Sequence, residues 1–406
     1  MAAGILRVST FGNTIGRPEE NVQVTIKNQQ GQFQSQEFTD RQGILPPVLL
    51  PAPDDSSALT PPDTQDSMTD NDLPFARYDI EAENREGEQV SIKGVQVYEN
   101  TVSLQNIFFP GQSSRINIPD PVIMGGFPEK IPEAEIKKMP EAGGTVVLPK
   151  AVVPELVVVH AGVPSDSSAA DYTITFKDYI KNVASSEIYP TWPKEALKAN
   201  IIAIISFTLN RVYTEWYRGK GYDFTITNST AYDQAFTYGR NIFSEISEIA
   251  DEVFNLYITR PGLSQPLFAQ YSDGIRVKRN GWLSQWGSKE LADRGYSAQR
   301  ILQTYYGRDI IIREAETASG IPISFPGVLD TGSRGNAVRV IQNQLNAISD
   351  RFPLIPKLAV DGIYGPKTRE AVRTFQQIFN LPVTGAVNYP TWYRISDIYV
   401  SVSGIA

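Results

Sequence analysis

A proline-rich stretch between residues 113 and 155 is the feature that most constrains the fold of this chain. It carries seven prolines and four glycines. Proline removes a backbone donor and holds the chain extended, so no long helix or central strand can cross this stretch. We expect a connector that runs over surfaces and is accessible to proteases, serving either as a plain spacer or as a processing site. A chain of 406 residues is long enough for two to four domains, and the connector sets the first boundary.

Composition excludes several classes of site. The chain has no cysteine, which excludes disulfides and thiolate metal ligands. Its one histidine, His160, follows the apolar run 157–159 and is expected at the end of a strand. We therefore predict no metal and no other cofactor, and any catalysis should rest on carboxylates. The net charge of −8 argues against a nucleic acid partner, because phosphate binding needs a basic face.

No segment has the pattern of a membrane span or a leader. The longest apolar run, IIAII at 201–205, is far too short to cross a bilayer. Residues 1–20 lack a basic region followed by an apolar one. We expect a chain with no membrane span and no Sec signal.

Residues 1–112 predict an all-β, sandwich-like module. Segments such as GILRVST, NVQVTIKN and VSIKGVQVYEN alternate in side-chain type and end at turn-forming residues. A Pro/Asp/Ser-rich insert at 50–74 interrupts the pattern and is expected to be an exposed, mobile loop. No catalytic constellation is visible in this module, so its expected role is folding, docking or inhibition.

The rest of the chain predicts two further units after the connector. Residues 156–318 mix strand and helix patterns and are expected to form an α+β domain. Its central helix should start at Pro193, stop at Gly219 and be buried, since apolar residues surround most of it. Residues 319–406 read as three short helices joined by glycine turns, with a pseudo-repeat that places a threonine six residues after a glycine. The predicted fold class is therefore multidomain.

The C-terminal unit resembles the small helical peptidoglycan-binding domain of cell-wall lytic enzymes. The resemblance rests on LDTGSRGNAVRVIQNQL, VDGIYGPKTREAVRTFQ and LPVTGAVNYPTW. It implies a binding module with a shallow polar groove and no catalytic site. Asp361 and Tyr364 are expected to form turns and to pack rather than to bind ligand.

The central unit resembles the catalytic domain of the sporulation stage II protein D family, which are lytic transglycosylases of peptidoglycan. The resemblance rests on DYIKNVASSEIYPTWPKEALKAN and GWLSQWGSKELADRGYSAQRILQTYYG, and more loosely on TAYDQAFTYG. Some members hold zinc through cysteine and histidine, and this chain lacks the cysteine. The arginine usual in the family is replaced by Ile205, which favours a non-catalytic reading or an altered substrate preference.

With the β-module and connector in front, the whole chain resembles the clostridial spore cortex-lytic enzymes in their proenzyme form. This resemblance implies that a serine protease removes the N-terminal portion during germination and that the product degrades cortex peptidoglycan. It also implies a protein made in the mother cell and laid onto the cortex and coat region without Sec export.

Two glutamates flank the Tyr-Pro break in the middle of the chain, and their surroundings differ. Glu195 falls in the first turn of a helix, where free amides and the positive end of the dipole stabilise the anion, so a structural role is expected. Glu187 has Ile188, Tyr189 and Trp192 near it, and apolar neighbours raise a carboxyl pKa. A raised pKa suits a proton donor, and the resemblance places the family's catalytic glutamate at Glu187. The alternative is a surface glutamate at a helix end.

The resemblance also implies a reaction that needs one carboxyl group. The acid protonates the oxygen between N-acetylmuramic acid and N-acetylglucosamine, and its carboxylate then takes a proton from the sugar's 6-hydroxyl, which closes a 1,6-anhydro ring. Polar positions that match the family's cleft predict substrate contacts, although each could instead cap a turn: Tyr232, Gln234, Tyr271, Ser272, Ser284 and Gln285. Trp282 and Trp286 either stack on sugars or belong to the core.

Two function classes therefore stand at this point. One is a cortex peptidoglycan transglycosylase stored as a zymogen. The other is a non-catalytic wall- or coat-binding protein with the same fold, and an amidase is a further alternative.

Overall fold

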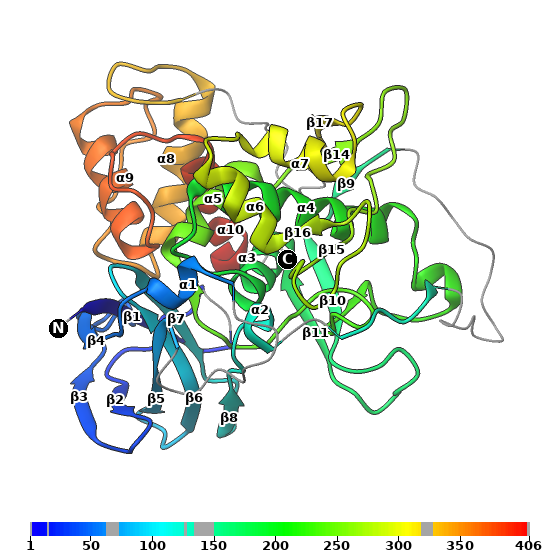
Figure 1. Cartoon of the computed structure of the whole chain (residues 1–406). Coiled ribbons are helices and arrows are strands. Elements are labelled where there is room, and N and C mark those ends of the chain that lie inside the picture. The colour runs from blue at the N-terminus through cyan, green and yellow to red at the C-terminus, as the bar shows by residue number, and fades with distance from the viewer. Residues whose placement is uncertain are drawn as a thin grey trace.

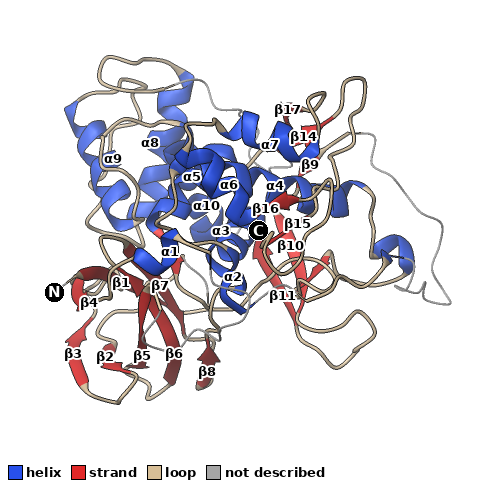
Figure 2. Ribbon diagram, in the orientation of Figure 1, coloured by secondary structure: helices blue, strands red, loops and turns tan. Residues whose placement is uncertain are grey.

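The computed structural model describes residues 2–13, 16–61, 73–125, 128–133, 150–317 and 328–403. Strands gather in an N-terminal module, helices dominate a central unit, and a small helical unit ends the chain (Figures 1 and 2). The multidomain arrangement and the helical C-terminal unit are as predicted. No helix within the described ranges is both long and apolar enough to cross a membrane.

The N-terminal module contains two facing sheets. One has the strand order β3-β2-β5-β6-β8 and the other β13-β7-β1-β4. Alternate residues point into the space between them, and Leu6, Val24 and Ile80 are fully buried there. The strands are β1 (Ala3–Phe11), β2 (Gln23–Asn28), β3 (Phe33–Phe38), β4 (Val48–Pro51), β5 (Phe75–Glu83), β6 (Gln89–Tyr98), β7 (Val102–Phe108) and β8 (Ser114–Asn117).

The second sheet is completed from outside the module. Strand β13 (Ile242–Phe243) comes from the central unit and pairs antiparallel with β7, with Ile242 opposite Leu104. The sequence did not predict this pairing, because a two-residue strand carries no periodic signal.

The Pro/Asp/Ser-rich insert is only partly the exposed loop that was expected. Residues Ser56–Leu59 form the short helix α1, and Ala58 is fully buried. The Ala58 carbonyl accepts a hydrogen bond of 2.8 Å from the Trp192 indole of the central unit. The burial that this contact provides overrides the polar composition of the segment. Residues 62–72 of the insert lie outside the described residues.

The central unit is organised around α3 (Phe176–Glu187) and α4 (Lys194–Tyr213). Helix α3 begins where the Thr175 hydroxyl accepts from the Asp178 amide, and it ends just before Pro190. Helix α4 is buried around most of its circumference, as predicted, but it ends at Tyr213 rather than at Gly219. A short 3₁₀ turn, η3 (Arg218–Lys220), follows it.

The other elements of the central unit surround these two helices. The strands are β9 (Val152–Val153), β10 (Leu156–His160), β11 (Asp171–Thr175), β12 (Ile226–Thr227), β14 (Leu256–Thr259), β15 (Tyr271–Ser272), β16 (Leu283–Ser284), β17 (Ile311–Glu314) and β18 (Glu316–Thr317). The helices are α2 (Val122–Gly125), α5 (Ser244–Val253), α6 (Gln285–Asp293) and α7 (Ala298–Tyr306). Helix α2 belongs to the connector, and the strands β8 and β9 also lie within residues 113–155, so the ends of the expected connector are part of the sheets of the two neighbouring units.

The C-terminal unit consists of α8 (Asn336–Ser349), α9 (Pro366–Ile378) and α10 (Tyr389–Ser403). The pseudo-repeat has a structural basis in two glutamines. The Gln342 side chain accepts from the Gly362 amide at 2.9 Å and donates toward Thr368 at 3.3 Å. Gln376 does the same with Gly385 at 2.8 Å and Thr391 at 3.1 Å. Each buried amide thus ties a glycine turn to the helix that follows it.

Candidate active site

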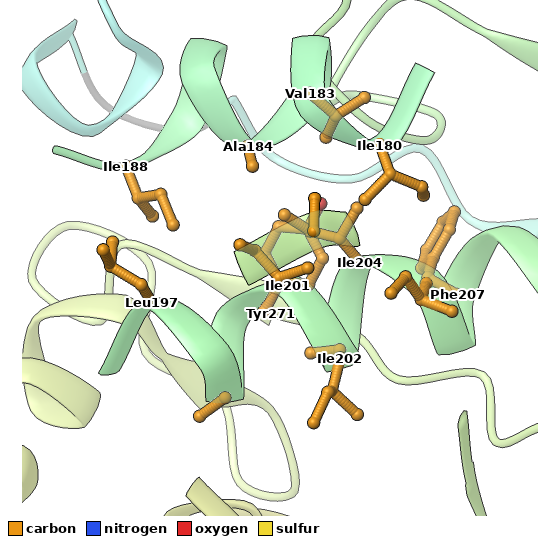
Figure 3. Close-up of a cluster of buried hydrophobic side chains, with 14 of the residues drawn as sticks. Ile180, Val183, Ala184, Ile188, Leu197, Ile201, Ile202, Ile204, Phe207 and Tyr271 are labelled. Carbon is orange, nitrogen blue, oxygen red and sulfur yellow. The ribbon is translucent and has the colours of Figure 1, made fainter. Parts of the chain in front are cut away.

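Glu187 is the last residue of α3, and its side chain has no solvent exposure. Its Oε1 accepts a hydrogen bond of 2.8 Å from the Ala235 backbone amide. Ile188, Tyr189 and Trp192 follow it along the chain, and all three are buried. Figure 3 shows apolar side chains of α3 and α4 that face one another, with Ala184 and Ile188 on one side and Ile201 on the other, together with Tyr271.

The surroundings of Glu187 change its acidity. Burial raises the pKa of the Glu187 carboxyl from 4.5 to about 7. Hydrogen bonds from the Ala235 amide and the Tyr271 hydroxyl, and the charge of Lys130, act in the opposite direction but are weaker. Glu187 can therefore both hold and release a proton near neutral pH, which is what general acid–base catalysis requires.

Gln234 organises the polar side of the site. Its Oε1 accepts from the Tyr179 hydroxyl at 3.0 Å and from the Thr208 hydroxyl at 2.8 Å. Its Nε2 donates to the Tyr271 hydroxyl oxygen at 3.0 Å and to the Ile204 carbonyl at 3.2 Å. Because Tyr271 accepts from Gln234, its own proton is available to the Glu187 carboxyl.

The two tyrosines of this network are neutral donors. Burial raises the pKa of both Tyr179 and Tyr271 well above the usual value. Gln234, Tyr271 and Glu187 therefore form one connected group, but Gln234 is fully buried, and it positions Tyr271 rather than facing open space.

A second buried network, around Arg211 and Asp233, was missed by the sequence analysis. Arg211 donates from Nε to Asp233 at 2.7 Å and from both terminal nitrogens to Glu133 at 2.9 and 2.8 Å. Asp233 also accepts from the Tyr217 hydroxyl and from the amide and hydroxyl of Thr227. The available signal was a charged Arg211 close after the apolar stretch of α4, which calls for a buried partner.

The connector lies across this part of the molecule. We call residues 122–125 and 128–133 the strap. The Lys130 ammonium donates to the Asp233 carbonyl at 2.6 Å, and the Ile131 amide donates to the Ala231 carbonyl at 2.8 Å. Further contacts join Glu129 to Arg279 at 2.5 Å and the Met124 carbonyl to the Arg276 guanidinium at 2.9 Å.

The strap also contributes charge to the site. Burial lowers the pKa of Lys130 to about 8, although the nearby Asp233 acts in the opposite direction. Lys130 binds the carbonyl of Asp233, the residue before Gln234. The positive charge of Lys130 lowers the pKa of Glu187. The Glu187 side chain itself has no solvent exposure.

The remaining predicted site residues have local structural contacts. The Ser272 hydroxyl donates to the Val277 carbonyl at 2.7 Å, and the Ser284 hydroxyl accepts from the Gly287 amide at 2.9 Å as the N-cap of α6. Gln285 is fully buried on α6, and its amide group has no hydrogen-bond partner among the described residues. Tyr232 packs beside Tyr217 and Phe224 in a separate aromatic cluster.

Three other residues singled out in the sequence have structural surroundings. Glu195 accepts from the Ala298 amide at 2.6 Å and so joins α4 to the start of α7. His160 ends β10, is buried, and contacts Asp171 at 2.8 Å through Nδ1. Ile205 is fully buried in the core. Within the part of the chain that the structure describes, no group of three or more His, Asp or Glu side chains is placed to hold a metal ion.

Comparisons with known proteins match two parts of the chain. A family model described as "Stage II sporulation protein" matches residues 167–252, and one described as "Putative peptidoglycan binding domain" matches residues 334–395. Two parts of the chain are thus similar to a sporulation family and to a family of peptidoglycan-binding domains. The first match contains Glu187, Asp233 and Gln234, and the second spans α8, α9 and the start of α10.

Other comparisons add little to this. No match to a curated protein is found. Among solved structures, the chain is similar to the SleB N-terminal domain, with 27% identity over 19% of this chain and 99% of that chain, at a TM-score of 0.17. At that TM-score the likeness carries no statement about the fold.

Proposed function

We propose that this protein is a peptidoglycan lytic transglycosylase that acts on spore cortex, with Glu187 as its acid and base. The observation that carries the proposal is a fully buried carboxyl at the end of α3 whose pKa is raised to about 7. The match of residues 167–252 to a sporulation family and the peptidoglycan-binding match at 334–395 support the substrate class.

The reaction follows from one carboxyl group. Protonated Glu187 gives its proton to the oxygen that links N-acetylmuramic acid to N-acetylglucosamine, and the bond from that oxygen to the muramic C1 breaks. The Glu187 carboxylate then takes the proton of the muramic 6-hydroxyl while that oxygen bonds to C1. The carboxyl returns to its starting state, and the tethered nucleophile has a high effective concentration.

The supporting residues have distinct roles in this proposal. Tyr271 donates toward the carboxylate that remains after proton transfer, and Gln234 holds Tyr271 in position. The Ala235 amide fixes the direction of the carboxyl group. A positioned general acid–base group is worth roughly 10²–10⁴-fold in rate.

We further propose that the chain is stored in an inactive form and activated by a protease that cuts the connector. The full burial of Glu187 supports this, as does the contact of Lys130 in the connector with Asp233, close in sequence to Gln234 and Ala235. A serine protease as the activating partner, germination as the occasion, and a place at the cortex and coat without Sec export belong to the same proposal. Residues 126–127 and 134–149 of the connector lie outside the described residues.

The full burial of Glu187 is also compatible with a protein that binds the cell wall and has no catalytic activity. A wall-binding protein would keep the buried network for stability and use only its C-terminal unit. An amidase is a further alternative, because the peptidoglycan-binding match would be equally compatible with cleavage of the stem peptide.

The identity of the products separates these alternatives. Protein cut in the connector is incubated with purified cortex, and the soluble fragments are examined by mass spectrometry. Anhydro-muramic ends support the transglycosylase. Reducing muramic ends would indicate a muramidase, free stem peptides an amidase, and intact cortex a binding protein.

A further inference from the structure

The surface between the N-terminal module and the central unit contains a shared β-sheet. Strand β13 of the central unit adds to β7 of the module, and β7 pairs on its other side with β1 over residues Ile5–Phe11. The backbone hydrogen bonds of this pairing join segments on opposite sides of the connector. A cut in the connector removes none of them.

An apolar contact lies beside the shared sheet. Tyr98 at the end of β6 is fully buried and packs edge-on against Phe243, with ring centroids 5.1 Å apart, and against Tyr189 at 6.1 Å. Ala58, Phe75 and Tyr98 of the module belong to the same buried cluster as the core of the central unit. The two units thus share a core instead of touching at a polar surface.

Buried polar groups are also paired across this boundary. The Asn241 side chain donates to the Gln96 carbonyl at 3.0 Å, and the Arg240 guanidinium donates to the Gln96 side chain at 3.1 Å. The Trp192 indole donates to the Ala58 carbonyl at 2.8 Å. Separation would expose the apolar cluster and break these bonds together, which opposes dissociation.

The module contacts the C-terminal unit as well. Phe11 of β1 belongs to the buried cluster of the C-terminal helices. The Arg7 guanidinium donates to the Asn380 side chain at 2.8 Å. The module is therefore held by both of the units that follow the connector.

The second half of the strap, residues 128–133, is held differently. It is held by hydrogen bonds from Lys130 and Ile131, by an exposed ion pair of Glu129 with Arg279, and by Glu133, which binds the buried Arg211. None of residues 128–133 belongs to the shared apolar cluster, and Arg211 keeps its ion pair with Asp233 when Glu133 leaves.

We propose that the N-terminal module is a stable non-covalent partner of the rest of the protein. Cleavage of the connector after the strap then gives a two-chain complex, in which residues 128–133 become a free end that can leave the site while the module stays. Neither the association of the module nor the release of residues 128–133 depends on which reaction Glu187 supports.

The test uses the full chain with residues 141–147 replaced by the recognition sequence of a site-specific protease. After complete cutting, verified on a denaturing gel, the sample is run by gel filtration at low and at high salt. We expect both fragments in one peak at the position of the uncut protein under both conditions. Two separate peaks at either salt concentration would overturn the proposal.

Hydrogen exchange on the same cut sample tests the contrast with the strap. We expect the amides of β7 and β13 to keep the protection they have in the uncut chain, while residues 128–133 lose theirs. Loss of protection at β7 and β13 would contradict the proposal even if the fragments co-elute. A Tyr98→Ala chain, shown to be folded before cutting, should separate at a lower urea concentration than the parent, and equal urea concentrations would contradict the role given to Tyr98.

Discussion

At the scale of single residues, the central feature is a carboxyl group kept out of water. A buried carboxylate without a full counter-charge is unfavourable, so the protonated form of Glu187 is favoured. The Ala235 amide, Tyr271 and Lys130 limit the rise, so the pKa of Glu187 stops at about 7 instead of rising further. Burial therefore costs stability whenever Glu187 is ionised, and these contacts reduce that cost.

A stability measurement tests this account without any substrate. The folded protein binds the Glu187 proton more readily than the unfolded chain, so this group's contribution is full below about pH 4.5 and is lost as the pH rises toward 7. The Glu187→Gln side chain stays neutral at every pH. Above pH 7, the free energy of unfolding of this variant should therefore exceed that of the parent by about 3 kcal/mol.

Denaturant unfolding of parent and Glu187→Gln at pH 5 and pH 8 checks this. The difference in the free energy of unfolding between the two proteins should be small at pH 5 and large at pH 8. A difference of the same size at both pH values would mean that Glu187 is ionised throughout.

Tyr271→Phe tests the tuning of the acid. The Tyr271 hydroxyl lowers the pKa of Glu187, so its removal should raise that pKa further. Glu187 would then stay protonated to higher pH, and the alkaline limb of the plot of kcat/KM against pH should shift to higher pH. An unchanged limb with a reduced rate would leave Tyr271 with a purely structural role.

The sequence predicted part of this site for a physical reason. The apolar neighbours of Glu187 are close along the chain, so a raised pKa could be inferred locally. Arg211, Asp233 and Lys130 meet only in the folded protein, from segments as far apart as 103 residues for Lys130 and Asp233. Serines such as Ser272 and Ser284 are equally suited to caps and to ligands, and composition does not separate the two roles.

At the scale of elements, the end of α3 and the strap both contact the segment 231–235. Helix α3 must stop before Pro190, which places Glu187 at a helix end beside the residues 231–235. The strap contacts the same segment through Lys130 and Ile131. We expect opening of the site to involve movement of the strap.

Weakening the strap should open the site without a cut. Glu129→Gln combined with Glu133→Gln removes its ion pairs to Arg279 and Arg211. The Glu129–Arg279 pair is exposed and contributes up to about 1 kcal/mol, and the pair of Glu133 with the buried Arg211 contributes at least as much, so the open fraction should rise about tenfold or more. The rate at which the uncut chain releases cortex fragments should rise by the same factor.

Lys150→Gln is the matched control for that variant. Lys150 pairs with Glu316, which lies outside the strap. This change should leave the uncut chain as inactive as the parent. Equal activity of the parent before and after cutting would remove the basis for an inhibited form.

At the scale of the whole molecule, the units are more tightly joined than the sequence indicates. The proline-rich connector, the β-module and the three C-terminal helices were predicted from proline content, alternation and helical spacing. The pairing of β7 with β13 and the docking of α1 on Trp192 were not, because contacts between units leave no periodic pattern in either one. For the same reason, the insert at 50–74 was expected to be an exposed loop.

The role of Glu187 as acid and base is best tested by a rate. The quantity to measure is the rate at which protein cut in the connector forms anhydro-muramic ends. It should be compared between the parent, Glu187→Gln and Glu195→Gln, the last of which keeps an oxygen to accept from the Ala298 amide. We predict a loss of at least about 10²-fold for Glu187→Gln and near-parental rates for Glu195→Gln. A Glu187→Gln protein that forms anhydro ends at the parental rate would contradict the role of Glu187 as acid and base.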